Sequence, residues 1–417
     1  MASPPALKSY AASFQDVLRQ MEGSTAPGPE EVKAWARQAV NAERAGGPDP
    51  HVAFAHGSLG LLAGHTSYME GYAVLMSLPF GVAVAMHASE KAQARLRHTN
   101  DDRRWTWTPD ASQPPDAELP TWVRVVRESL RRAGLAVPVE VVVASAMPPA
   151  CIDARLSALS VATMRAYHSF ASDQAQPHEA PPEEAPDEAT VAQWVRSVLS
   201  TCTGVPYSNA YPLAVQAADP PGLTLVDTSK ADHLPLSAPP ADEVRWGLIT
   251  ADHTPVRSSA HHHDQHQRAI DALRALNQTP YGPLTSFSQM EHRDLDKALG
   301  RLDPVYRPVA RHLVGENRRV ARLVRAVQTH DWQLLGTLLM MSHHSLRDEW
   351  GGTNEVVDYI VDAVADRATD GMFGACLTGR GQAVLLVGRS LALHRCMNEV
   401  TADLHATFGL DAQALVL

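Results

Sequence analysis

Four histidines and an aspartate stand close together in the segment Ser258-Ser-Ala-His-His-His-Asp-Gln-His-Gln-Arg268. His262 and His266 are four residues apart, so on a helix they share one face, where two imidazoles can bind a metal ion. His261 and His263 would then point elsewhere. No HExxH pattern and no third ligand accompany them, so we predict no metal site. The alternative to metal binding is that these are exposed or loop histidines without a ligand. Because imidazole titrates near neutrality, His262 is instead a candidate acid or base.

The composition limits the class of protein. A chain of 417 residues with 45% hydrophobic content is long enough for two domains. The net charge of -10, without a long run of either sign, argues against a general nucleic-acid binder. The four cysteines are far apart in the sequence and show no CxxC spacing, so we expect reduced thiols in a reducing compartment. The chain starts without a secretory signal pattern and lacks an apolar run of about 20 residues, so we expect a soluble, cytoplasmic protein that does not bind membranes.

The hydrophobic patterns predict alternating helices and strands. A proline- and glutamate-rich loop at 174–189 marks the nominal boundary, so we predict an N-terminal helical cover at 1–48 and domains at 49–189 and 190–417. Helices are predicted at 6–21, 29–45, 122–133, 190–201, 268–276, 286–299, 305–328, 332–346 and 391–408. Strands are predicted at 74–78, 82–86, within 94–108, and at 137–144, 223–227, 246–250 and 384–387.

The stretch 55–85 carries a spaced set of residues, Gly57, Leu61, His65, Thr66, Tyr68, Gly71, Leu78, Pro79 and Gly81. With them it resembles the N-terminal signature of the galactokinase family, Pro-Gly-Arg-Val-Asn-Leu-Ile-Gly-Glu-His-Thr-Asp-Tyr-x-x-Gly followed by Leu-Pro-x-Gly. The family's arginine is replaced by Ser58, its sugar-binding glutamate by Gly64 and its sugar-binding aspartate by Ser67. The resemblance implies that His65 contacts the ligand or takes part in acid-base chemistry, with packing in a turn as the alternative.

A second resemblance lies in the phosphate loop of the GHMP superfamily, to which galactokinases belong. That family has Pro-x-Gly-x-Gly-Leu-Ser-Ser-Ser-Ala-Ala, in which glycines and a helix N-terminus bind phosphate. Here the aligned stretch is Pro148-Pro-Ala-Cys-Ile-Asp-Ala-Arg155. Ala150 and Ile152 stand where the family has glycine, and Asp153 adds a negative charge. Phosphate binding in the family's manner is therefore not expected.

Further motifs follow in the family's order. Cys202-Thr-Gly-Val-Pro-Tyr-Ser-Asn209 aligns with the family's Gly-Ile-Met-Asp-Gln, so its candidate base, an aspartate, becomes Tyr207. Tyr207 is a candidate acid or base, with packing as the alternative. Ser342-His-His-Ser-Leu-Arg-Asp348 and Gly374-Ala-Cys-Leu-Thr-Gly-Arg-Gly381 resemble the later motifs. An ungapped alignment also puts His262 near a tyrosine that lines the family's sugar pocket.

The resemblance implies an α/β (α+β) fold of two domains, with mixed sheets flanked by helices and a cleft between the domains. We expect His65, Tyr207 and His262 as catalytic residues and Ser58, Ser67, Tyr68 and Asn209 as substrate-binding residues. The former phosphate loop comprises Pro148, Ala150, Ile152, Asp153 and Arg155. The third-motif loop comprises Thr378, Gly379, Arg380 and Gly381.

Three functions remain open. The first is an enzyme that has lost ATP-dependent sugar phosphorylation and performs acid-base chemistry on a small polar or sugar-derived molecule. The second is a pseudokinase that senses a sugar or nucleotide and acts through a protein partner. The third is an active sugar or small-alcohol kinase whose phosphate site is rebuilt with Arg155 or Arg380. The cofactor is unknown; ATP and Mg²⁺ are expected only if kinase activity is retained.

Overall fold

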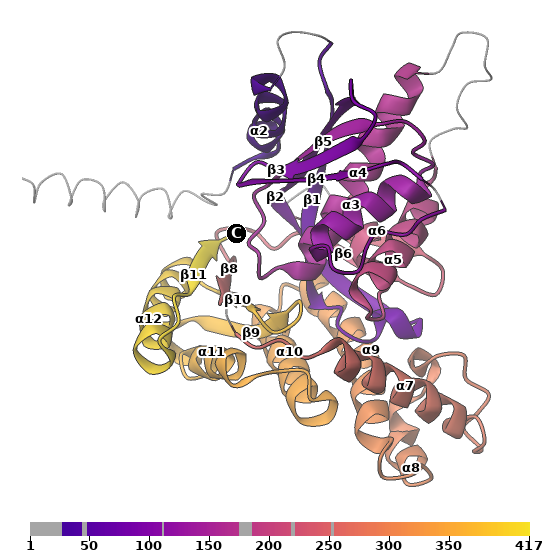
Figure 1. The fold of residues 1–417 in the computed structure, drawn as a ribbon. Coiled ribbons are helices and arrows are strands. Elements are labelled where there is room, and N and C mark those ends of the chain that lie inside the picture. Colours follow the sequence, from indigo (N-terminus) through magenta and orange to yellow (C-terminus); the bar gives the residue numbers. More distant parts are fainter. Residues whose placement is uncertain (1–26, 44–47, 111, 175–185, 218–221, 252–253) are drawn as a thin grey trace, which may run out of the picture.

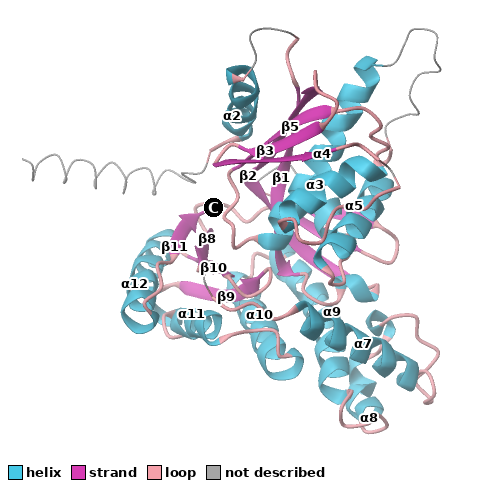
Figure 2. Ribbon diagram, in the orientation of Figure 1, coloured by secondary structure: helices cyan, strands magenta, loops and turns pink. Residues whose placement is uncertain are grey.

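The computed structural model describes residues 27–43, 48–110, 112–174, 186–217, 222–251 and 254–417. Two β-sheets, each flanked by helices, make a mixed α/β architecture, which confirms the predicted fold class (Figure 2). The predicted helix at 6–21 lies outside the described residues. Among the described helices, none combines the length and apolar character that crossing a membrane requires.

The larger sheet is built around the long strand β2 (Tyr72–Ala88). Its path runs β4-β3-β5-β2-β6-β7, and β1 pairs separately with β2. All the pairs are antiparallel except β3 with β5. The other strands are β1 (His51–Leu62), β3 (Ala94–His98), β4 (Asp101–Trp107), β5 (Val139–Ser145), β6 (Leu223–Asp227) and β7 (Asp232–Leu236).

Both faces of the larger sheet are covered, because alternate residues of β2 are apolar on each side. Ala83 and Ala85 pack with α2 (Pro29–Ala42) on one face. Val82 and Val84 belong to the main core on the other face. That face carries α3 (Thr121–Arg132), α4 (Ile152–Gln174), α5 (Glu188–Thr203) and α6 (Ala210–Gln216) (Figure 1).

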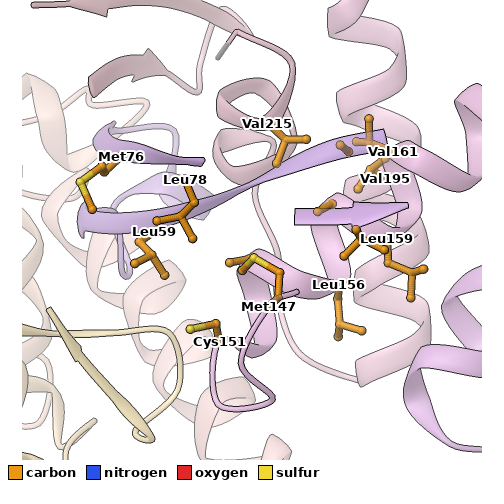
Figure 3. Packing of buried hydrophobic residues seen from close by; sticks show 14 of the residues in the cluster. Leu59, Met76, Leu78, Met147, Cys151, Leu156, Leu159, Val161, Val195 and Val215 are labelled. Carbon is orange, nitrogen blue, oxygen red and sulfur yellow. The ribbon is translucent and has the colours of Figure 1, made fainter. Parts of the chain in front are cut away.

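The main core fixes the start of α4 against the sheet. Figure 3 shows Leu59 and Leu78 of the β1–β2 pair near Met147 and Cys151, with Leu156 and Leu159 farther along. All six side chains are at most 5% exposed. The N-terminal turn of α4 is therefore held rigidly at the end of the sheet, where it borders the cavity described below.

The smaller sheet is antiparallel, with the order β11-β8-β10-β9. Its strands are β8 (Arg245–Thr250), β9 (Met372–Thr378), β10 (Ala383–Gly388) and β11 (Gln413–Val416). The helices α10 (Trp332–Ser345), α11 (Glu355–Ala365) and α12 (Ser390–Phe408) pack on it.

Helix α10 touches β9 backbone to backbone. A Cβ atom on Gly336 would lie 2.0 Å from the carbonyl oxygen of Phe373, and one on Gly374 would lie 2.3 Å from the carbonyl oxygen of Gly336. No side chain fits between the two elements at this point, so two glycines are required.

A third group of helices has its own core and lies at the lower right in Figure 1. It contains α7 (Ser259–Leu276), α8 (Leu295–Leu299) and α9 (Arg307–Gln328). Short turns of 3-10 helix, Phe287–Gln289 and His292–Asp294, precede α8, and a π-helical turn, Leu346–Trp350, follows α10. Helix α9 also contacts β2 and α10, so it connects this group to the rest of the molecule.

Three sequence-based expectations differ from the structure. The strands predicted at 74–78 and 82–86 form one strand, because β2 continues through Pro79 as a bulge, in which residues 78–80 lie opposite the single residue Gly57 of β1. The helix predicted at 286–299 reduces to the short turns and α8. The larger sheet does not end at the predicted boundary at 189, because β6 pairs with Tyr72–Met76 of β2.

Candidate functional site

A cavity of about 90 Å³ lies where the two sheets and the third helical group meet. Its walls come from the turn after β1, the first turn of α4, the loop before α6, helices α7, α9 and α10, and the loop between β9 and β10. Its polar lining residues are His65, Ser67, Tyr68, Asp153, Tyr207, Ser208, Tyr211, His262, His312, Glu316, Ser342, Thr378 and Arg380.

One end of the cavity is built on a buried ion pair. Asp153, in the first turn of α4, accepts a hydrogen bond from Arg380 Nε at 2.8 Å, and the two side chains are 13% and 17% exposed. The Tyr207 hydroxyl also donates to Asp153, and the Arg380 guanidinium lies 4.6 Å from the centroid of the Tyr207 ring. Burial raises the pKa of Tyr207 well above its ordinary value, and the Asp153 carboxylate raises it further. The phenol therefore keeps its proton.

The rest of the former phosphate loop is not among the residues that line the cavity. Pro148 closes a turn through a bond from the Cys151 amide, and Ala150 is buried. Ile152 begins α4. Arg155 acts electrostatically on His98 and is not among the residues that line the cavity. The structure thus brings Asp153 and Arg380 together but leaves Arg155 elsewhere.

The turn after β1 supplies the neighbouring wall. The imidazole of His65 stacks on the buried indole of Trp350, with centroids 4.0 Å apart. Its Nδ1 lies 2.5 Å from the Tyr68 hydroxyl. Burial, followed by the nearby His312, lowers the pKa of His65 well below its ordinary value, and burial raises that of Tyr68. A neutral His65 therefore shares one hydrogen bond with the Tyr68 hydroxyl through Nδ1, and either group can be the donor.

The histidine segment forms the first turns of α7, capped by Ser258. His262 lines the cavity, and its Nε2 is buried without a hydrogen-bond partner among the described residues. His266 packs on the Tyr68 ring, with centroids 5.0 Å apart. Within the described part of the chain, no three His, Cys, Asp or Glu side chains form a group that could hold a metal ion.

His262 should make the protein sensitive to acid. Burial, followed by Arg380, lowers its pKa to about 4, below the roughly 6.5 of an unfolded chain. The unfolded state then binds more protons between these values, so stability falls as the pH falls through that window. We expect His262 to account for a loss of about 2 kcal/mol in the free energy of unfolding between pH 7 and pH 5.

Urea titrations at the two pH values measure this loss. The variant His262→Gln should lose that part of the pH dependence, whereas His263→Gln, a change at the exposed neighbour, should keep it. Equal pH dependence in His262→Gln and the unaltered protein would contradict the assignment.

Other predicted residues lie outside the cavity lining. Ser58 is buried in β1, 3.5 Å from the carbonyl oxygen of Tyr211. Asn209 is buried before α6, and its amide lies 3.5 Å from the carbonyl oxygen of Thr228. Gly381 accepts bonds from Thr254 and Asn354 through its carbonyl. Ser67, Thr378 and Gly379 do line the cavity.

Sequence reasoning missed the wall formed by α9 and α10. His312 and Glu316 are buried on α9, and Ser342 of α10 donates to Glu316 at 2.8 Å. The available signal was a histidine and a glutamate four residues apart on the apolar face of an amphipathic helix. Such a polar pair needs buried partners, and here it borders the cavity.

No family model matches the chain. The chain is similar to galactokinases over most of its length. It is 25% identical over 362 residues to the galactokinase of Thermotoga petrophila, covering 86% of this chain and 95% of that protein. It is 25% identical over 417 residues to the galactokinase of Bos taurus, covering 94% and 98%.

The fold is also similar to solved kinase structures. The Lactococcus lactis galactokinase complexed with galactose superposes with a TM-score of 0.79 at 16% identity, covering 92% of this chain and 96% of that one. The Methanococcus jannaschii mevalonate kinase gives a TM-score of 0.56 at 10% identity, covering 88% and 98%. These likenesses concern the fold.

Proposed function

We propose that this chain, a galactokinase-like member of the GHMP kinase superfamily, binds a small, neutral, sugar-like molecule in the cavity without transferring phosphate from ATP. The observation that carries this proposal is the Asp153 carboxylate, held by Arg380 and Tyr207 in the first turn of α4. A helix N-terminus attracts anions. Here a side chain of the protein itself supplies the anion.

The residues at this end do not fit ATP and Mg²⁺. A triphosphate approaching the first turn of α4 would meet the Asp153 carboxylate, and like charges repel. Ile152 adds a branched side chain where the family's glycine lets the backbone approach phosphate. We therefore route no step through ATP.

The remaining polar groups suit a neutral ligand. Lowered pKa values keep His65 and His262 neutral near pH 7, and Tyr207 stays protonated. An uncharged imidazole nitrogen can accept a hydrogen bond from a hydroxyl group of such a ligand. His262, with an unpartnered Nε2, is the better placed of the two histidines, since Nδ1 of His65 is engaged by Tyr68.

The ligand class rests on the comparison and on charge. The solved galactokinase is a complex with galactose, so a hexose is the natural first probe for this cavity. Glu316 lines the cavity beside neutral histidines, which favours hydroxyl groups over anions.

A second candidate is a sugar kinase with a rebuilt phosphate site. The galactokinase relatives, which match most of the chain, favour this candidate. Arg380 is the arginine that would bind phosphate, provided that the incoming anion displaced Asp153 from it. The comparisons thus favour the kinase, whereas the Asp153 carboxylate in the first turn of α4 favours loss of phosphoryl transfer.

Calorimetric titration of the full chain distinguishes the two. We expect galactose to bind and to raise the melting temperature, while ATP with Mg²⁺ gives no heat of binding up to millimolar concentration. Incubation with galactose and ATP should yield no sugar phosphate. Magnesium-dependent ATP binding, or sugar phosphate formation, would establish the second candidate instead. Failure of galactose and other hexoses to bind would contradict the ligand class.

A further inference from the structure

His312 reaches the cavity from α9, outside all the motifs that the sequence suggested. Its side chain is 1% exposed and lines the cavity. Nδ1 lies 2.9 Å from Ser345 Oγ, and that hydroxyl lies 2.6 Å from Glu349 Oε2. An ionised carboxylate can only accept, so Ser345 donates its proton to Glu349 and accepts one from His312 Nδ1.

This chain of bonds fixes the tautomer of His312. With the proton on Nδ1, Nε2 carries a lone pair and acts as an acceptor. Nε2 is buried and has no hydrogen-bond partner among the described residues. Burial also lowers the pKa of His312 to about 4, so the imidazole is neutral near pH 7. A buried acceptor without a partner is costly, which is why it points to a ligand.

The groups around His312 define the chemistry that it would meet. The ring lies beside His65 and Trp350, with centroids 5.7 and 5.2 Å away. One turn farther along α9, Glu316 receives bonds from Ser342 and from Arg319 and also lines the cavity. This end of the cavity therefore presents two acceptors, an imidazole nitrogen and a carboxylate. Such a pair favours a neutral molecule with several hydroxyl groups over an anion.

We propose that Nε2 of His312 is a specificity-determining acceptor for one hydroxyl group of the cavity's ligand, with Ser345 and Glu349 as positioning residues. The ligand class, a neutral polyol, rests on the proposed function. The tautomer and its dependence on Ser345 do not. Gly64 and Ser67 stand where the galactokinase family has its sugar-binding glutamate and aspartate. Hydrogen bonding from α9 would then replace the sugar contacts that those two carboxylates make in the family.

Two matched variants separate the two ring nitrogens. The variant His312→Asn keeps an amide N–H near the Nδ1 position, and so the bond to Ser345, but removes the acceptor at Nε2. The variant His312→Gln places its amide near the Nε2 position. In calorimetric titrations of the full chain with galactose, we expect His312→Asn to bind roughly tenfold more weakly. His312→Gln should retain more of the affinity.

Galactose analogues that lack one hydroxyl each identify the contact. For the unaltered protein, one of these analogues should bind roughly tenfold more weakly than galactose. For His312→Asn, the same analogue and galactose should bind with about equal affinity. Ser345→Ala should weaken galactose binding less than His312→Asn, because Nε2 remains while its orientation is lost. If His312→Asn binds galactose as tightly as the unaltered protein, the proposal is wrong.

Nitrogen-15 NMR of the imidazoles separates this proposal from the proposed function. We expect unprotonated Nε2 and protonated Nδ1 at His312, and a mixture of tautomers in Ser345→Ala. If galactose, glycerol and myo-inositol all fail to bind, the polyol class is wrong. The NMR tautomer of His312 then still tests whether its Nε2 is a hydrogen-bond acceptor. Unprotonated Nδ1 at His312 would overturn it, and unprotonated Nε2 that depends on Ser345 would sustain it.

Discussion

Replacing Asp153 with alanine is expected to lower the free energy of unfolding by about 3 kcal/mol. The substitution leaves Arg380 largely buried, without the carboxylate that its Nε contacts at 2.8 Å, and leaves the Tyr207 hydroxyl without its acceptor. An uncompensated buried charge costs far more than the loss of a solvent-exposed pair. Urea unfolding followed by circular dichroism measures the change.

Inorganic phosphate provides the sharper readout. With the carboxylate gone, the first turn of α4 and Arg380 are free to bind an anion, so phosphate should stabilise Asp153→Ala more than the unaltered protein. The control is Asp271→Asn, which breaks a solvent-exposed pair with Arg274 and should change stability little. A stability loss below about 1 kcal/mol in Asp153→Ala would show that the pair is not the buried unit described here.

Replacing Gly336 with alanine is expected to destabilise the protein by about 3 kcal/mol or more, although alanine is the better helix former. The new Cβ would lie 2.0 Å from the carbonyl oxygen of Phe373, an overlap that no side-chain rotation relieves. Helix α10 would have to move away from β9 and open the core beneath it. Thermal and urea unfolding measure the effect.

Gly300→Ala is the control, at a glycine with right-handed helical backbone that ends α8. There the added Cβ would come no closer than 3.4 Å to a neighbouring atom, the carbonyl oxygen of Lys297, which is ordinary contact. We expect little change in stability for this variant. A Gly336→Ala protein as stable as Gly300→Ala would contradict the close packing of α10 on β9.

The sequence predicted much of the fold because its strongest signals are local. Short apolar runs and capped amphipathic stretches located most of the long helices, including α3, α9 and α12, within a few residues. The pairing of strands is not local. Nothing near residue 223 indicates that β6 pairs with β2, about 150 residues earlier, so the nominal boundary at 189 cut across one sheet.

The site was predictable only where its residues stood in motifs. Alignment with the galactokinase motifs located His65, Tyr207 and Arg380, which the structure brings to one cavity. The alignment gave no site residue on α9, because the role of His312 depends on its hydrogen bond to Ser345, which lies 33 residues later in the sequence. Asp153 was noticed as a misplaced charge, but the sequence did not reveal that Arg380, 227 residues away, neutralises it.

The contact between Gly336 and Gly374 also couples the two ends of the cavity. Helix α10 carries Ser345, which orients His312, and β9 leads into the loop that carries Arg380. With no deformable side-chain layer between them at this point, α10 and β9 shift as one body. If a molecule that displaces Arg380 also shifts β9, we expect α10 to move Ser345 with it, and any change in affinity at His312 would be matched by an equal change near Arg380.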